Sequence, residues 1–98
     1  MGIFKSDFRT KYLGHDFLLF ENDRISQQII NGHGWENHIT QLIDIFCKQG
    51  MIVIDCGANF GLFTLQLAKA VGAQGKVYAF ETQNLISQQL NLNVITNG

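Results

Sequence analysis

Proline is absent from this chain of 98 residues, and neither a low-complexity segment nor an internal repeat interrupts it. The length favours a single domain, because domains of globular proteins mostly span about 50–200 residues. Charged residues make up only 15% of the chain, whereas hydrophobic residues make up 46%. This balance excludes intrinsic disorder, which is typical of high charge and low hydrophobicity. The sequence therefore predicts one small folded domain.

Further absences exclude several classes of function. No block of Lys and Arg is present and the formal net charge is −1, so we expect no nucleic-acid partner. No run reaches the roughly 18–20 apolar residues that cross a bilayer, and residues 1–12 contain no apolar stretch typical of a secretory signal. Cys47 and Cys56 are the only cysteines, too few for a disulfide framework or a zinc cluster. We therefore predict a cytoplasmic protein without membrane contact and without a bound metal.

Residues 1–34 are predicted to form an N-terminal cap of strands and loops. Two short stretches, at residues 8–13 and 16–20, flank Gly14-His15, which is typical of a hairpin turn. Residues 23–30 are compatible with either a short helix or extended chain. The cap precedes the part of the sequence in which the clearer motifs lie.

Residues 35–98 predict an α/β unit in which helices alternate with two apolar strands. Both strands lack a polar face, which favours a parallel sheet covered on both sides. Each strand ends in an acid, Asp55 or Glu81, and ligands of such sheets bind beyond these carboxyl ends. The predicted order is a helix at residues 35–48, a strand at 51–55, a helix at 62–71, a strand at 76–81 and a helix at 83–94.

The first of these helices is predicted from the spacing of its apolar residues. The positions follow the 3.6-residue period of an α-helix and form one stripe, which we expect to face the core. The stripe consists of Trp35, Ile39, Leu42, Ile43 and Phe46.

The turn at residues 56–61 contains glycines in the spacing Gly57-x-x-x-Gly61. A P-loop that starts at Gly57 needs a second glycine at position 62, which is Leu62. The dinucleotide motif GxGxxG also fails, because Asn59 and Leu62 occupy two of its glycine positions. Asn tolerates the left-handed conformation, and the amides at the start of the next helix suit one carboxylate rather than a pyrophosphate.

Glu81 ends the second strand, 20 residues beyond Gly61. A carboxylate at this place accepts hydrogen bonds from both hydroxyls of a ribose, and each such bond contributes about 1.5–3 kcal/mol. Because Glu81 alone fits NAD as well as other nucleosides, the glycine spacing decides between them.

Together these residues resemble the FkbM-type methyltransferases, which use S-adenosylmethionine (SAM). The resemblance rests on the run VIDCGANFGLFTLQLAK, on GKVYAFE and the helix that follows, and on Gly34-Trp35-Glu36 upstream. It covers about residues 34–97, two-thirds of the chain. It implies a Rossmann-like class I methyltransferase fold in truncated form. Residues 35–98 supply the first βαβα portion of this fold, and the N-terminal cap of a hairpin and a helix precedes it in the sequence.

The resemblance also implies roles for individual residues toward SAM. We expect Glu81 to hold the ribose, Thr82 to lie with Gln83 beside the adenine, and Glu36 to reach the ammonium group. Family members usually have proline at the position of Thr82, so this turn is expected to be less rigid here. The methionine end of SAM is expected to be surrounded by Asp55, Gly57, Ala58, Asn59 and Gly61.

The expected activity, by the same resemblance, is methyl transfer to a hydroxyl group of a small molecule or glycan. The catalytic residues are unknown, because the family analogy places the acceptor pocket in the later part of such a fold. The resemblance puts the helices at 35–48, 62–71 and 83–94 on one face of the sheet and leaves the other face apolar and uncovered. We therefore expect either a truncated product or fragment, or a second chain that completes the sheet.

Two other functions stay open at this point. An NAD-linked oxidoreductase would use Glu81 in the same way, although the failed GxGxxG spacing disfavours it. A non-catalytic remnant or assembly module would bind no cofactor, and its sheet edge would be satisfied only in an oligomer.

Overall fold

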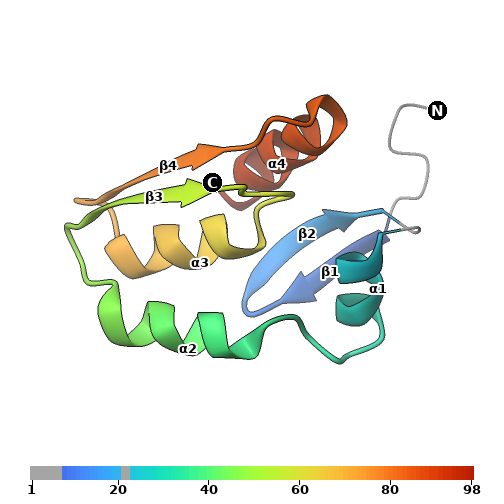
Figure 1. Cartoon of the computed structure of the whole chain (residues 1–98), viewed down its shortest axis with the longest axis horizontal. Coiled ribbons are helices and arrows are strands. Elements are labelled where there is room, and N and C mark those ends of the chain that lie inside the picture. The colour runs from blue at the N-terminus through green and yellow to red at the C-terminus, as the bar shows by residue number, and fades with distance from the viewer. Residues whose placement is uncertain (1–7, 21–22) are drawn as a thin grey trace.

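The structure is a computed structural model and describes residues 8–20 and 23–98 (Figure 1). Within these residues it contains four helices and two sheets of two strands each, which confirms the prediction of a mixed α/β fold. Residues 1–7 and 21–22 lie outside the described part. The prediction that residues 1–12 contain no secretory signal therefore falls mostly on residues outside it. In the described part, no helix has both the length and the apolar character to cross a bilayer.

The predicted N-terminal hairpin is confirmed. Strand β1 (Phe8–Tyr12) pairs antiparallel with strand β2 (His15–Leu19), and Tyr12 lies opposite His15. The two-residue turn therefore consists of Leu13 and Gly14, one position earlier than predicted. Both residues have positive φ, 50° and 81°, as a type I′ hairpin turn requires.

The segment that the sequence left open is a helix, α1 (Arg24–Ile30). Asp23 precedes it in an extended conformation, and its carboxylate Oδ2 accepts hydrogen bonds from the backbone N–H and the hydroxyl of Ser26, both at 2.8 Å. This is an N-cap, which satisfies a backbone donor that has no partner inside the helix. Asp23 thus decides between helix and extended chain.

Helix α2 (Asn37–Phe46) is shorter than the predicted helix at residues 35–48, and two residues of the predicted apolar stripe, Leu42 and Phe46, are exposed. Ile43 is its one buried residue, whereas Phe46 is 67% exposed. The prediction that the whole stripe faces the core was therefore wrong. Helix α2 packs on helix α3 rather than on the sheet. A contact with one helix covers fewer apolar side chains than a contact with a sheet would.

The predicted βαβ unit is confirmed. Strand β3 (Ile52–Cys56), helix α3 (Leu62–Val71) and strand β4 (Lys76–Phe80) follow one another, and the two strands pair in parallel. Because Cys56 lies opposite Phe80, the carboxyl ends of both strands meet at one edge. The turn after β3 and the acid after β4 are therefore neighbours.

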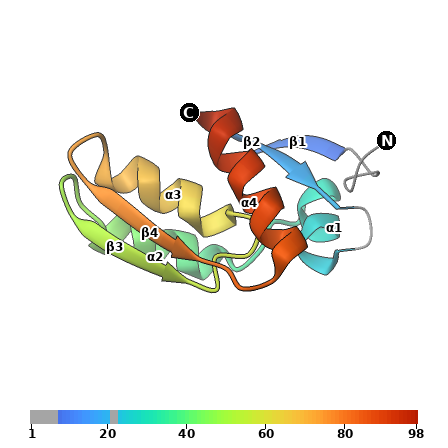
Figure 2. The same cartoon turned by 90° about the horizontal axis from the view of Figure 1, so that it is seen from above.

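The helices do not all cover the sheet as the resemblance implies. Helix α3 packs against β3 and β4, and α2 lies beyond α3 in a further layer (Figure 1). Helix α4 (Asn84–Asn97), three residues longer at its end than predicted, packs mainly against β2 of the hairpin (Figure 2). Within the described residues, the expectation that the other face of the sheet is apolar and uncovered is confirmed, since its exposed side chains include Ile52, Ile54, Tyr78 and Phe80.

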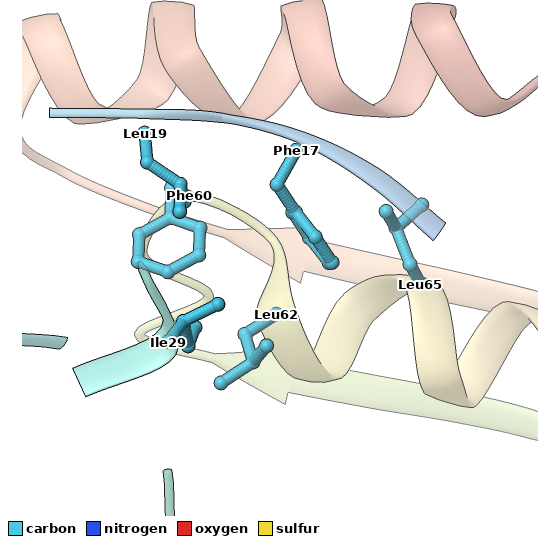
Figure 3. Packing of buried hydrophobic residues seen from close by; sticks show 6 residues of the cluster. All are labelled: Phe17, Leu19, Ile29, Phe60, Leu62 and Leu65. Atoms are coloured by element: carbon cyan, nitrogen blue, oxygen red, sulfur yellow. The ribbon is translucent and has the colours of Figure 1, made fainter. Parts of the chain in front are cut away.

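The hydrophobic core lies beside the turn after β3 rather than in the middle of the sheet. Its side chains come from β2, α1, the turn and the first half of α3, and they converge as Figure 3 shows. The aromatic ring of Phe60, in the turn, stands edge-on to the ring of Phe17 with 6.0 Å between centroids. The cluster consists of Phe17, Leu19, Ile29, Phe60, Leu62 and Leu65.

Candidate functional site

The turn between β3 and α3 has the backbone conformation that its glycines and asparagine predict. Gly57, Asn59 and Gly61 all have positive φ, at 72°, 54° and 106°. The backbone N–H groups of Gly57 and Ala58 both donate to the carbonyl oxygen of Phe80 at 2.9 Å. The last residue of β4 therefore holds the start of the turn, which fixes the turn at the carboxyl edge of the sheet.

Glu81 connects the end of β4 with the turn. Its Oε1 accepts a hydrogen bond from the backbone N–H of Asn59 at 2.8 Å, and its Oε2 accepts one from the N–H of Gln83 at 3.0 Å. An ionised carboxylate offers about four lone-pair positions, so about two stay available for ligand hydroxyls. The sequence predicted Glu81 at this edge, and the structure adds that it holds Asn59 in place.

Asp55 contacts helix α3 rather than the open side of the turn. Its Oδ2 accepts a hydrogen bond from the hydroxyl of Thr64 at 2.6 Å, and its side chain is only partly exposed. A negative charge beside the first turn of a helix also interacts favourably with the helix dipole. Asp55 therefore anchors the start of α3 to the end of β3.

The amides of the turn have partners within the protein. Besides the three donors already described, Phe60 donates its N–H to its neighbour's side-chain oxygen, Asn59 Oδ1, at 2.9 Å, and Gly61 donates to the carbonyl of Ala58 at 3.1 Å. A ligand carboxylate at this edge would therefore be received by the first turn of α3, whose N–H groups have no partner four residues back inside the helix. This is the place that the sequence predicted for a ligand carboxylate.

A small pocket of about 150 Å³ lies along the turn. Gly57, Ala58 and Asn59 line one part of it, and Trp35 and Glu36 line another. A Cβ atom added to Gly57 would meet no atom within 4 Å, so the space over this glycine is open. The volume is below the roughly 300–1,000 Å³ of pockets that enclose a whole small molecule, so the pocket fits one end of a larger ligand.

Glu36 has an unusual backbone conformation at this pocket. Its φ of 44° and ψ of 55° lie in the left-handed region, where a residue other than glycine is uncommon. It stands directly before α2 and makes no side-chain cap hydrogen bond to that helix. Strained residues of this kind are frequent at ligand sites.

Four of the predicted site residues do not line this pocket: Asp55 and Glu81, whose hydrogen bonds are given above, and Gly61 and Thr82. Gly61 is buried, and a Cβ atom added to it would come within 3.0 Å of Leu90 Cδ1 in α4, so its role is close packing. Thr82 is exposed and does not line the pocket. Two larger hollows, of about 520 and 380 Å³, contain Thr64 and Gln66 respectively but none of the predicted site residues.

Sequence reasoning missed three residues that support the turn. Thr64 binds Asp55, Phe60 anchors the turn in the core, and Asn93 of α4 donates to the carbonyl of Phe60 at 2.9 Å. Only Asn93 had a signal in the sequence, because Gln89, Asn93 and Asn97 repeat every four residues and so share one face of the helix.

Among residues 8–20 and 23–98, no group of three or more His, Cys, Asp and Glu side chains could hold a metal ion. No family model, curated protein or solved structure matches this chain.

Proposed function

We propose that this chain carries the cofactor-binding part of a SAM-dependent methyltransferase that acts on a hydroxyl group of a small molecule or glycan. The observation that carries the proposal is the meeting of Glu81 with the left-handed turn at Asn59, at the carboxyl edge of a parallel strand pair. Ligands of open α/β sheets bind at this edge. A turn without GxGxxG glycines favours a nucleoside that has no pyrophosphate.

The residues present fit the two ends of SAM. Glu81 has lone pairs left for the ribose hydroxyls, and the open space over Gly57 lets a ligand approach the backbone. Glu36 brings a carboxylate to the small pocket, where it would attract the ammonium group of the methionine end. The first turn of α3 would receive the carboxylate of the same end.

SAM supplies an activated methyl group when it is bound. The contribution of this chain is to bind the nucleoside and orient it, and orientation by itself lowers the barrier of a transfer reaction. The acceptor and any group that takes its proton lie outside the residues assigned here. Thr82 and Gln83 follow Glu81 directly and are both exposed, so they are the residues nearest in sequence to the expected adenine position.

Calorimetric titration with S-adenosylhomocysteine (SAH), the product of methyl transfer, tests this proposal. We expect SAH to bind to the wild type and Glu81→Ala to weaken binding about tenfold or more, because each hydrogen bond to a charged acceptor contributes about 1.5–3 kcal/mol. Glu81→Gln keeps an oxygen for the N–H of Asn59 and should lose less. Asp44→Ala, which removes an exposed carboxylate from α2, is the control and should bind as the wild type does.

NADH in the same titration distinguishes the proposal from an oxidoreductase. Heat with NADH and none with SAH would overturn the methyltransferase assignment. A wild type that is folded by circular dichroism and binds neither nucleoside would also overturn it.

A second candidate function, an assembly module, is favoured by the uncovered face of the β3–β4 sheet. Ile52 is 70% exposed and Ile54 is 65% exposed, next to Tyr78 and Phe80. Contiguous apolar patches of this kind are typical of association surfaces. A second chain that completes the sheet would cover this face and pair with its edges.

A further inference from the structure

Helix α4 presents three amide side chains to the free edge of β2. Asn97 Oδ1 accepts the N–H of Asp16 at 2.8 Å, and its Nδ2 donates to the carbonyl of the same residue at 2.7 Å. Asn93 Oδ1 accepts the N–H of Leu18 at 2.7 Å, and Gln89 donates to the carbonyl of Leu18 at 2.7 Å. The three amides thus hydrogen-bond the strand edge as a neighbouring strand would.

Asn93 differs from the other two amides because it also binds the turn. Its Nδ2 donates to the carbonyl of Phe60 at 2.9 Å, in addition to its contact with Leu18. The residue is 1% exposed, so water does not replace either bond. One buried side chain therefore joins the hairpin to the loop between β3 and α3.

Phe60 lies directly after the residues of the turn that are proposed to contact the ligand. Its preceding residue, Asn59, donates its N–H to Glu81, and the ring of Phe60 packs edge-on against Phe17 of β2. The hairpin thus holds Phe60 in two ways, by the aromatic contact and through Asn93. Both contacts act on the residue next to Asn59.

We propose that Asn93 is a positioning residue that couples the docking of the β1–β2 hairpin to the conformation of the 57–61 turn. The hairpin then controls how well the turn and Glu81 bind a nucleoside. The part that concerns the ligand rests on the proposed function, whereas the coupling itself does not. Because coupling between two sites is reciprocal, a nucleoside bound at the turn stabilises the hairpin by the same factor.

Native-state hydrogen exchange on the wild type tests the coupling without any substitution. The N–H groups of Leu18, in the hairpin, and Asn59, in the turn, should exchange through one shared opening with the same dependence on denaturant. The N–H of Gly50, which donates to the carbonyl of Val71 at the far end of α3, is the internal control for local opening. Separate openings for Leu18 and Asn59 would overturn the proposal.

The matched pair Asn93→Ala and Asn97→Ala separates positioning from general stabilisation. Both variants remove an amide that binds β2, but only Asn93→Ala removes the bond to Phe60. We expect exchange at the N–H of Asn59 to become about tenfold faster, and SAH binding about tenfold weaker, in Asn93→Ala alone. In Asn97→Ala both should change less than in Asn93→Ala, because the hairpin loses contacts with α4 but Asn93 still binds Phe60. Both variants are compared at denaturant concentrations where each is folded.

Equal effects of the two variants on Asn59 would overturn the proposal, since the amides would then only stabilise the fold. If SAH binds to no variant while exchange at Asn59 still distinguishes the pair, the coupling holds and the proposed function fails. If Asn93→Ala does not fold, the shared or separate opening of Leu18 and Asn59 in the wild type decides.

Discussion

The two sheets of this protein have the same number of strands but opposite surroundings. In the hairpin, β2 buries Phe17 and Leu19 in the core, and the amides of α4 bind its free edge. In the β3–β4 sheet, α3 covers one face, and the other face exposes Ile52 and Phe80. A pair of strands gains little stability by itself, so the covering elements decide how stable each sheet is.

The two sheets differ in whether their apolar faces and backbone edges have partners. At the hairpin, both the apolar face and the backbone edge of β2 have partners from elements far away in the sequence. In the β3–β4 sheet, every second residue points to a face that is mostly apolar, and this face has no partner among the described residues. We therefore expect the hairpin side to govern stability and the open sheet face to govern association.

The largest expected effect comes from replacing one phenylalanine on each side. Phe17→Ala removes a ring that is 1% exposed and should lower the free energy of unfolding by about 3–5 kcal/mol. Phe80→Ala removes a ring that is 57% exposed and should cost less than about 1 kcal/mol. Urea unfolding followed by circular dichroism measures both. Equal losses would show that the open face is covered in solution.

The two glycines of the turn give a smaller contrast. Gly61→Ala places a methyl group against Leu90 in addition to straining a positive φ, and should cost about 1–3 kcal/mol. Gly57→Ala strains the backbone but meets open space, and should cost about 1 kcal/mol. Chemical denaturation of both variants measures the difference, and a reversed order would contradict the packing of Leu90 on Gly61.

The open sheet face should govern self-association rather than folding. Ile54→Lys places a charge on the exposed face and should weaken association of the chain about tenfold, which is 1.4 kcal/mol, with little change in unfolding. Sedimentation velocity over a range of concentrations measures this. Gln41→Lys, on the exposed part of α2, is the control for the added charge. A wild type that stays monomeric at all concentrations would contradict the prediction.

The smallest expected effect is a pH dependence on the hairpin side. Burial, together with nearby Lys69, lowers the pKa of His15 below its usual 6.5, while Asp16 acts in the opposite direction. As the pH falls below about 6.5, the unfolded chain binds a proton at His15 before the folded protein does, so stability decreases. The decrease ends once the pH is below the lowered pKa of the folded state, because both states are then protonated.

His15→Gln should remove this part of the pH dependence, and unfolding free energies measured between pH 7.5 and 5 would show it. His38→Gln, in which an exposed histidine of α2 is replaced, is the matched control. If the unfolding free energy depends on pH equally in His15→Gln and in the wild type, His15 is not the cause of the dependence.

Local patterns predicted a good part of the fold. The bounds of α3 agree with the prediction for residues 62–71, and the hairpin turn was displaced by only one residue. Helix α3 and the hairpin turn depend on the spacing of apolar residues and on glycines that lie only a few residues away in the sequence. The apolar stripe of α2 misled the prediction because its pattern does not say whether a sheet or only another helix covers it.

The candidate site was predicted in its position but not in its internal contacts. The acid at the end of β4 and the left-handed turn at Asn59 follow from residue type and spacing. The bond between Glu81 and the N–H of Asn59, and the use of the neighbouring amides by Phe80, do not. Those contacts need the two strands to be side by side, and their parallel register alone brings the two ends together.

The sequence by itself determined the order of strands and helices from residue 35 onward, the hairpin and the turn conformation at Gly57 and Asn59, because these follow from steric preferences of single residues and of near neighbours. Only the tertiary structure decided which apolar faces are buried and that Asn93 joins the hairpin to the turn. Leu18 and Asn93 are 75 positions apart, and no local preference acts over that distance. Their contact exists because burial of Phe17, Leu19 and Phe60 in one core brings β2 and α4 together.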